Sequence, residues 1–476
     1  MKTGILSIDQ STTSTKVYLM DTHGNIMDEV AHKHQQFYPQ SGWVEHDAME
    51  IYHNMRKGIE TMLSRWDGEV LGIGISNQRE TTVVWDRETG QPLYHAIVWQ
   101  CRRTMDQCIA LKEYEPLVEK KTGLKIDPYF SATKIKWLLD HIDVPYHRVC
   151  AGTMDSWLLY QLTGRHLCDH TNASRTLLYD LDQRDWDEEL LEIFQIPRCI
   201  LPTIVESDGD FGTVELLGRT LPILSVIGDS QSALYAHGAY HKGDVKITMG
   251  TGSSVMMNMG AERKPQTNGV VTALAYRTRK DTAYAGEAII NSSADTLNWL
   301  RDDLGLYDQD AILNDLKMDA HGVYLVPAFV GLGIPYWMSN AKACVSGISR
   351  NTSKQDLIVA GLSSIAYQIY DAITALEEHA GSEAVRISAD GGASRNPILM
   401  QFLSDISQKE IMTFEQSAFS AYGVYLLAMQ RLGIPCENVQ KIQRIYHPMM
   451  KDDQRKQLLD GWRRAIEMVV YDAKRR

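Results

Sequence analysis

Two similar strand–turn–strand segments, placed about half a chain length apart, constrain the fold more than any other feature. The first joins residues 5–8 to 17–20 through a polar turn, and the second joins 245–248 to 254–258 through Gly250-Thr251-Gly252-Ser253. Small, hydrogen-bonding residues at each bend are typical of hairpins. A chain of 476 residues is long enough for two domains. We therefore predict two similar α/β domains, residues 1–240 and 241–476.

Between and after the hairpins, strand patterns alternate with helix patterns. Residues 70–75, 81–85 and 96–99 have the composition of strands. Apolar residues at helical spacing indicate helices over 133–140, over 355–377, and near the end of the chain from Leu458 to Val469. This alternation favours sheets covered by helices.

Charged side chains follow two of these strands directly. Arg79 and Glu80 come after residues 70–75, and Asp229 comes after the apolar residues 221–227. Fixed charges at strand ends form polar small-molecule sites in α/β proteins. The alternative for Asp229 is an N-cap of a helix over 230–237.

Three turns have the composition of phosphate-binding turns: residues 9–16, Gly250-Thr251-Gly252, and Asp390-Gly391-Gly392 with Asn396 after it. None fits the Walker or GxGxxG pattern. The alternatives are a hydroxyl-rich hairpin without ligand and an ordinary strand–helix turn. Taken with the charged strand ends, the turns indicate phosphoryl transfer to a hydroxyl.

The net charge and the cysteine spacing argue against several other classes of protein. The net charge is −12 and no block of five basic residues occurs, which argues against a nucleic-acid surface. Seven scattered cysteines without CxxC spacing argue against disulfides or zinc and favour the cytoplasm. With no signal peptide core and no run of 18 apolar residues, we expect no membrane span.

Several stretches together resemble the FGGY family of carbohydrate kinases, and within it the glycerol kinases. They are residues 42–47, 77–82, 96–103, 127–130, 171–176, 326–333 and 335–337. The resemblance implies two actin-like (ribonuclease-H-like) ATPase domains with an interdomain cleft. It implies phosphorylation of a terminal hydroxyl of a small polyol or sugar by ATP with Mg²⁺, without a nucleic-acid partner. We also expect a homodimer.

The same resemblance assigns roles to residues. Asp229 matches the general base. Asp9 and Asp229 match the carboxylates at the metal. Substrate-binding positions are Arg79, Glu80, Trp99, Tyr129, Asp229, Ser230 and Ser254. Nucleotide-binding positions are Thr12, Thr13, Ser14, Lys16, Gly250, Thr251, Gly252, Ala294, Asn298, Gly391, Gly392 and Asn396.

The chain departs from the family pattern at several of these positions. Ser11, Lys16, Ala294, Asn298, Met338 and Ser363 stand where Gly, Arg, Gly, Gln, Asp and Glu are usual. Ser230 replaces a Gln, and Ser254 replaces the Phe that walls the glycerol pocket. These two changes predict a wider, more polar pocket, which favours a substrate longer than glycerol, such as a four- or five-carbon polyol or ketose. Glycerol stays the default substrate that the resemblance implies, and the longer compound is the alternative.

Two other functions stay open from the sequence. An actin-like ATPase without sugar substrate would share the phosphate turns but would not need Arg79, Glu80, Trp99 and Tyr129. A catalytically weakened sensor would explain the nucleotide-side changes, yet Asp9, Asp229 and Thr251 are intact.

Overall fold

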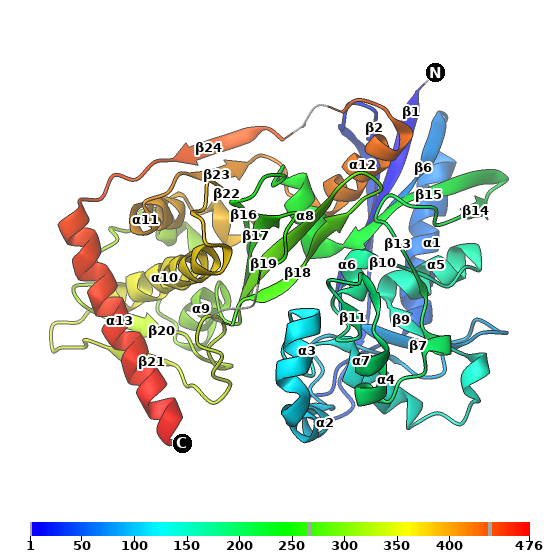
Figure 1. Ribbon diagram of the computed structural model, residues 1–476. Coiled ribbons are helices and arrows are strands. Elements are labelled where there is room, and N and C mark those ends of the chain that lie inside the picture. The colour runs from blue at the N-terminus through cyan, green and yellow to red at the C-terminus, as the bar shows by residue number, and fades with distance from the viewer. Residues whose placement is uncertain (1, 265–268, 437–439) are drawn as a thin grey trace.

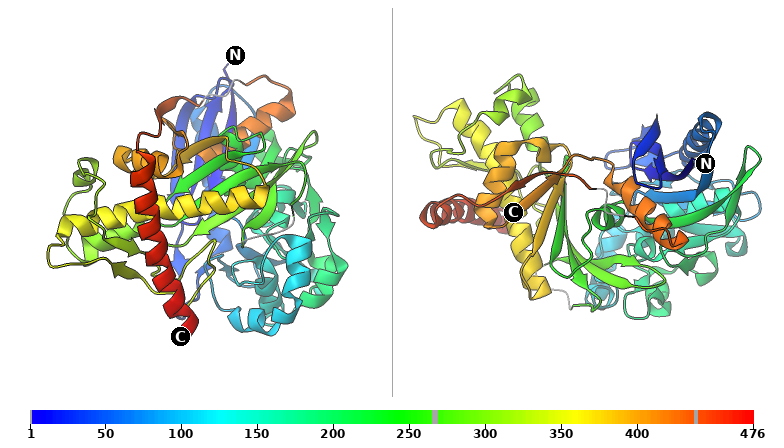
Figure 2. Two further views of the ribbon diagram at one scale, coloured as in Figure 1. Left: turned by 60° about the vertical axis from the view of Figure 1, so that its left-hand side comes forward. Right: turned by 90° about the horizontal axis from the view of Figure 1, so that it is seen from above.

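The first lobe is built on a six-stranded sheet. The computed structural model describes residues 2–264, 269–436 and 440–476 and shows two lobes (Figures 1 and 2). The strand order is β14-β15-β6-β1-β2-β3. The strands are β1 (Thr3–Gln10), β2 (Ser14–Asp21), β3 (Ile26–Lys33), β6 (Glu69–Asn77), β14 (Thr213–Leu216) and β15 (Arg219–Gly228). The predicted first hairpin is confirmed, because β1 and β2 pair antiparallel with Ile8 opposite Val17.

Parallel pairing gathers three strand ends in this sheet. β6 pairs in parallel with both β1 and β15, and Asn77 lies opposite Gln10 on one side and Gly228 on the other. The carboxyl ends of parallel strands meet at one edge of a sheet. The turn after β1, the Arg79–Glu80 pair after β6 and Asp229 after β15 therefore lie at the same edge.

The second lobe contains a seven-stranded sheet with the order β18-β19-β17-β16-β22-β23-β24. Its strands are β16 (Asp244–Met249), β17 (Ser253–Gly260), β18 (Val271–Arg277), β19 (Thr282–Ile290), β22 (Arg386–Asp390), β23 (Ile411–Phe414) and β24 (Ile442–Tyr446). The predicted hairpin β16–β17 is confirmed. β16 pairs in parallel with β22, Thr248 opposite Asp390, so the Gly250 turn and the Gly391 turn share one edge.

Helices cover both sheets, and the three predicted helices are confirmed as α4 (Ser131–Leu139), α10 (Lys354–Ala380) and α13 (Asp452–Arg475). On the first sheet, Leu6, Ile8 and Val17 point to a core shared with α1 (Ala48–Arg65) and α5 (Met154–Thr163). On the second sheet, α10 and α11 (Pro397–Ser407) close one core face. Because side chains alternate between the two faces of a strand, each sheet has a second face, and two other helices cover these second faces.

These two helices cross between the lobes. α8 (Asp229–Ala236) follows β15 of the first sheet, yet its Leu234 and Tyr235 pack with Met256 and Tyr276 of the second. α12 (Phe419–Leu432) belongs to the second half of the chain, yet it packs on Ile5, Tyr18 and Met20 of the first sheet. Figure 1 shows α12 beside β1 and β6. Each sheet is thus completed by a helix from the other half.

α10 is the one helix of the described residues that is long and apolar enough to span a membrane by length and composition. Its most apolar 18-residue window is 72% buried within the fold. A mostly buried helix of this kind is typical of the core of a soluble protein.

The five-stranded sheet of the first lobe, with the order β4-β5-β8-β7-β9, carries part of the site. Its strands are β4 (Gln36–Phe37), β5 (Glu45–His46), β7 (Thr82–Asp86), β8 (Ala96–Ile97) and β9 (Val149–Thr153). The other elements are α2 (Met105–Ala110), α3 (Glu115–Thr122), α6 (His170–Ala173), α7 (Glu188–Phe194), α9 (Asp295–Asn298), β10 (Leu167–Asp169), β11 (Tyr179–Asp180), β12 (Asp185–Trp186), β13 (Thr203–Val205), β20 (Tyr324–Val326), β21 (Cys344–Ser346) and the short turns η1 (Lys112–Tyr114), η2 (Tyr146–Arg148), η3 (Arg198–Ile200), η4 (Trp299–Asp303), η5 (Asp310–Asn314) and η6 (Ala393–Arg395).

The crossing of α8 and α12 depends on Gly423. A Cβ at this position would lie 2.1 Å from the Ser232 carbonyl oxygen. In an ordinary helix, Gly→Ala stabilises by up to about 1 kcal/mol. Here the clash reverses the sign, and we expect Gly423→Ala to lower the free energy of unfolding by about 1–3 kcal/mol in urea titrations.

The matched control is Gly392→Ala, because nothing lies within 4 Å of a Cβ built there. We expect that variant to change the free energy of unfolding by less than about 0.5 kcal/mol. Equal effects of the two substitutions would contradict the tight helix crossing.

Candidate functional site

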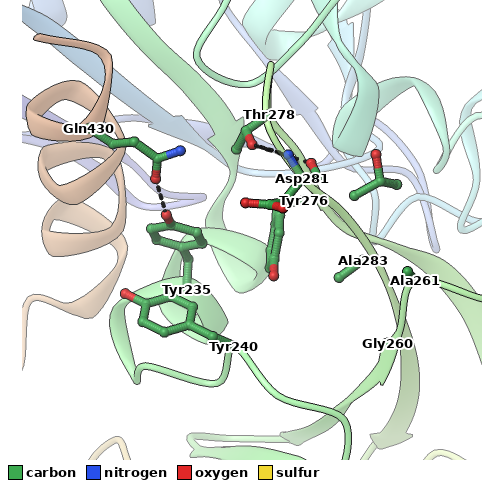
Figure 3. A pocket seen from close by; sticks show the side chains of 10 residues that line it. Tyr235, Tyr240, Gly260, Ala261, Tyr276, Thr278, Asp281, Ala283 and Gln430 are labelled. Carbon is green, nitrogen blue, oxygen red and sulfur yellow. Dashed lines mark hydrogen bonds between the residues drawn. The ribbon is translucent and has the colours of Figure 1, made fainter. Parts of the chain in front are cut away.

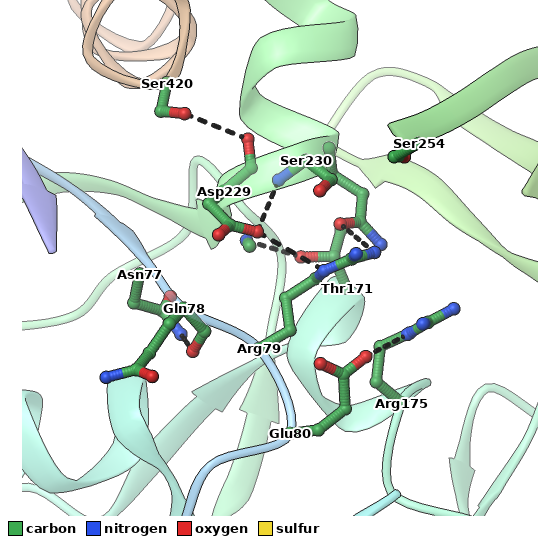
Figure 4. A network of polar contacts seen from close by, with 12 residues as sticks. Asn77, Gln78, Arg79, Glu80, Thr171, Arg175, Asp229, Ser230, Ser254 and Ser420 are labelled. Carbon is green, nitrogen blue, oxygen red and sulfur yellow. Dashed lines mark hydrogen bonds and ion pairs between the residues drawn. The ribbon is translucent and has the colours of Figure 1, made fainter. Parts of the chain in front are cut away.

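Arg79 is the centre of a buried polar network between the lobes (Figure 4). Its Nη1 and Nη2 donate to the two carboxylate oxygens of Glu287 at 3.1 and 2.9 Å, and Nη1 also donates to Gln231 at 3.3 Å. Its Nε lies 3.3 Å from Asp229 Oδ1. Gly228 makes room for this side chain, because a Cβ there would lie 2.9 Å from Arg79 Cγ. Arg79 therefore links the expected base to a carboxylate of the second lobe.

Glu80 lies beside Arg79 and has an unusual backbone conformation. Its φ is +58°, in the left-handed region that non-glycine residues rarely adopt. The Glu80 carboxylate pairs with Arg175 Nε at 2.5 Å, and its carbonyl oxygen accepts from Ser131 and Lys134. Backbone strain of this kind persists where surrounding contacts fix it, and it clusters at functional sites.

Glu287, on β19, is a site residue that the sequence analysis missed. It is fully buried and pairs with Arg79 and with Arg175, whose Nη1 lies 2.9 Å from its carboxylate. Burial alone would raise its pKa, but the adjacent Arg79 and Arg175 guanidinium groups hold the pKa of Glu287 well below its usual range. A single Glu within the small and apolar residues 285–290 was the signal for it in the sequence.

Asp229 begins helix α8 and is not its N-cap. The cap is Gly228, which makes no side-chain cap, so the N-cap alternative for Asp229 is wrong. Asp229 Oδ1 accepts from the Ser230 amide at 2.6 Å, and the Asp229 side chain is 32% exposed. A carboxylate that is held by Arg79 and still reachable can accept a proton from a bound hydroxyl.

Trp99 and Tyr129 stand together, with ring centroids 5.5 Å apart in an edge-to-face arrangement. Trp99 Nε1 donates to Thr12 Oγ1 at 3.0 Å. Both rings are only partly buried, and Tyr129 is close enough to Arg175 for a cation–π contact of 5.8 Å. The expected substrate side and the first phosphate turn are thus in direct contact.

The two hairpin turns have exposed threonines at their tips, Thr13 and Thr251. In the first turn, the Ser11 amide and hydroxyl both donate to the Ser14 carbonyl at 2.9 Å. In the second, the Gly250 amide donates to the Gly252 carbonyl at 2.9 Å. The third turn places Gly391 at φ +91°, where a side chain would be strained.

Helix α9 is tied to the Gly250 turn on the nucleotide side. The amides of Ser293 and Ala294 donate to the carbonyls of Thr251 and Gly250 at 2.9 and 3.1 Å. Asn298, at the end of α9, accepts from Arg301. The Asn396 side chain stabilises the local fold. Its Oδ1 accepts from the Leu399 amide and so caps α11, and its Nδ2 donates to the Leu313 carbonyl oxygen. The expected nucleotide residues of the second lobe therefore lie along connected elements.

The pair Asp9 and Asp229 is the candidate metal position. Burial and, after it, the nearby Asp229 carboxylate raise the pKa of Asp9 to about 6, although Lys16, opposite Asp9 on β2, acts to lower it. Adjacent acids that repel one another suit a divalent cation. No group of three His, Cys, Asp or Glu among the described residues could enclose a metal. The donor set fits Mg²⁺, which keeps waters and takes phosphate oxygens as further ligands.

Ser230 and Ser254 approach the site from opposite lobes, Ser230 on α8 and Ser254 on β17 (Figure 4). The Ser254 hydroxyl donates to Glu287 at 3.1 Å. Both side chains are partly buried. The position where an apolar ring is usual thus presents a small side chain that belongs to the Glu287 network.

A cavity of about 370 Å³ lies apart from these residues, around the carboxyl-terminal end of α8 (Figure 3). Tyr235, Tyr240, Tyr276 and Gln430 line it, and Tyr235 donates to Gln430 at 2.6 Å. It contains neither the phosphate turns nor Asp229, and so it is not the candidate active site.

The sequence matches known proteins over nearly its whole length. The profile of the FGGY family of carbohydrate kinases, N-terminal domain, matches residues 4–236, and that of the C-terminal domain matches 245–431. A glycerol kinase of Thermotoga maritima is 40% identical, with 98% of this chain and 100% of that protein covered. A Staphylococcus epidermidis glycerol kinase is also 40% identical, over 98% of each chain.

Solved structures match the fold as well. A Plasmodium falciparum glycerol kinase crystallised with ADP has a TM-score of 0.92 and 33% identity, with 98% of each chain covered. A xylulose kinase of Lactobacillus acidophilus has a TM-score of 0.88 at 20% identity, with 98% of this chain and 97% of that chain covered. The predicted two-domain actin-like fold is confirmed.

The raised pKa of Asp9 predicts a pH-dependent stability effect. An acid whose pKa is higher in the folded state than in the unfolded state penalises the folded state above both values, and the penalty disappears below pH 3.8. We expect Asp9→Asn to raise the free energy of unfolding of the ligand-free protein by about 1–2 kcal/mol at pH 8. At pH 4 the gain should nearly vanish, as urea titrations at the two pH values would measure.

Asp21→Asn is the control with the opposite sign. Burial would raise the pKa of Asp21, but hydrogen bonds from Asn25 and His23 lower it overall. That substitution should destabilise the protein at pH 8. A pH-independent effect of Asp9→Asn would refute the electrostatic explanation.

Proposed function

Because the chain belongs to the FGGY family of carbohydrate kinases, we propose that it transfers a phosphoryl group from ATP to a terminal hydroxyl of glycerol. The products are the phosphorylated polyol and ADP. The observation that carries the proposal is the position of Asp229: its carboxylate is held by Arg79 at 3.3 Å, stays partly exposed, and lies at the sheet edge where the first phosphate turn ends.

In this proposal Asp229 is the catalytic base. It accepts the proton of the attacking hydroxyl as the new oxygen–phosphorus bond forms and the bond to the leaving ADP oxygen breaks. Arg79 keeps the carboxylate oriented through its Nε. Glu80, Trp99 and Tyr129 surround the position where the polyol would bind, with the aromatic rings against its carbon chain.

The nucleotide would be bound mainly by the turns. Thr12, Thr13, Ser14 and Lys16 offer hydroxyls and a cation from the first lobe, and Gly250, Thr251 and Gly252 offer amides and a hydroxyl from the second. Ala294, Asn298, Gly391, Gly392 and Asn396 would lie on the adenosine side. Mg²⁺ held near Asp9 and Asp229 would neutralise phosphate charge in the transition state.

A second substrate class is favoured by a specific observation. Ser254 leaves no apolar wall and donates its hydroxyl to Glu287, and Ser230 is shorter than the usual Gln. Such a site is suited to additional substrate hydroxyls, because its buried polar groups can pair with them. A four- or five-carbon polyol or ketose is therefore the alternative to glycerol.

We also propose a cytoplasmic location and a homodimer. The support for the location is that none of the seven cysteines, all within the described residues, forms a disulfide, which suits a reducing compartment. The homodimer is an expectation from the sequence, and analytical ultracentrifugation would test it.

The experiment that tests the function is coupled ADP release with MgATP over a panel of acceptors: glycerol, erythritol, threitol, erythrulose, ribitol, xylitol, arabitol, xylulose and ribulose. We expect hydroxyl-dependent turnover with glycerol. If a four- or five-carbon acceptor is phosphorylated faster than glycerol, the alternative substrate class is established. ADP release at the same rate with and without each acceptor would instead indicate an actin-like ATPase.

Asp229→Asn keeps the size of the side chain but removes its basicity. We expect the turnover number to fall by roughly 10²- to 10⁴-fold with unchanged thermal stability. The same coupled assay measures it, and retained turnover would refute the role of Asp229 as base.

Ser254→Phe restores the ring that the family pattern usually has at this position. We expect the ratio of kcat/KM for glycerol to that for longer acceptors to rise, because the ring narrows the pocket and removes a hydroxyl. Ser230→Ala, which removes a hydroxyl without adding bulk, is the control. An unchanged ranking of acceptors would contradict the pocket argument.

A further inference from the structure

We propose that Glu287 is a positioning residue that aligns Arg79, and through it the base Asp229, when the two lobes meet. The inference rests on the proposed function for its catalytic meaning. Glu287 comes from β19 of the second lobe, whereas Arg79 and Arg175 come from the first. It is therefore the carboxylate that joins the polyol side of the site to the nucleotide side.

The contacts form a chain of alternating charges from one side of the site to the other. Glu80 pairs with Arg175, Arg175 pairs with Glu287, Glu287 pairs with Arg79, and Arg79 reaches Asp229. The distances along this chain run from 2.5 to 3.3 Å. Glu287 lies at the centre of this chain, and its contacts with Arg79 and Arg175 are the two that join the first lobe to β19 of the second. A displacement of Glu287 would therefore be transmitted to both ends.

The geometry of the Arg79 guanidinium explains how Glu287 acts on the base. A guanidinium group is planar, and its donors point in fixed directions. Two of its nitrogens are occupied by the two oxygens of Glu287. This bidentate contact fixes the plane of the group and thereby the direction of Nε, which faces Asp229. Without Glu287, the guanidinium could rotate away from the base.

Glu287 also holds the lobes together. Arg175 is fully buried and Arg79 is 6% exposed. Two guanidinium groups at an interface repel one another and lose hydration unless a carboxylate compensates them. Removal of that carboxylate favours separation of the lobes, because separation returns both groups to water. Alignment of the base and closure of the lobes are thus served by one side chain.

The test compares Glu287→Gln with Asp371→Asn. Asp371 is a partly buried carboxylate of the second lobe, on α10, that accepts from Trp462 at 2.8 Å and Tyr336 at 3.1 Å, away from the charge chain. We expect Glu287→Gln to lower kcat by roughly 10²-fold, as a small misplacement of a catalytic group does. The KM for ATP should change little, and Asp371→Asn should keep the kcat of the wild type.

The comparison of kcat with KM separates positioning from a general structural loss. A misplaced base lowers kcat while the KM for ATP stays near that of the wild type, whereas a general loss of structure disturbs ATP binding as well.

Small-angle X-ray scattering provides a readout that does not need a substrate. We expect the radius of gyration of ligand-free Glu287→Gln to exceed that of the wild type, and that of Asp371→Asn to equal it. If the wild type phosphorylates no acceptor, the proposed function fails, and the scattering still decides whether Glu287 holds the lobes together. An unchanged radius, or kcat within threefold of the wild type, would overturn the inference.

If Glu287→Gln does not fold, Glu287→Asp takes its place in every measurement. Its carboxylate keeps the charge but is one methylene shorter, so it cannot reach both nitrogens of Arg79 from the same backbone position. We expect a smaller loss of kcat than in Glu287→Gln, because the charge is kept. Full wild-type kcat in this variant would overturn the positioning role.

Discussion

The bidentate ion pair between Arg79 and Glu287 is the interaction on which the rest of the site depends. It lies between two sheets that each bring half of the chemistry: the first carries Asp229 and the aromatic residues, and the second carries the Gly250 and Gly391 turns. Buried charges are stable only when they are paired, so this pair favours one relative placement of the lobes. The site is thereby assembled by this ion pair between the lobes, by the apolar crossing of α8 and α12, and by apolar packing within each lobe.

Much of the fold was predictable from the sequence because its signals are local. The hairpins 5–20 and 245–258 follow from alternating residues and small turn residues, and the charges Arg79, Glu80 and Asp229 stand directly after apolar strands. The family motifs placed these residues in one site. The alternative that Asp229 caps α8 is wrong by one position, since Gly228 is the cap, and helix ends are the least well defined part of any sequence pattern.

What the sequence did not reveal is nonlocal. Arg79 and Glu287 are separated by 208 positions, and nothing near either residue specifies the other. Arg175 lay within a recognised motif, yet its pairing with Glu80 depends on how the loop after α6 folds against the strand end. Nothing in the sequence of α12 shows that it covers the first sheet rather than the second. Long-range pairing of this kind is fixed by the tertiary fold.

The crossing of α8 and α12 has a consequence for synthesis on the ribosome. The first sheet is complete as a set of strands once β15 has emerged, but Ile5, Tyr18 and Met20 stay uncovered until residues 419–432 follow. A nascent chain that has reached the middle of the molecule therefore exposes an apolar sheet face for the whole time needed to translate the second half. Such exposure invites chaperone binding or aggregation. It also means that hybrids between relatives must exchange the two crossing helices together.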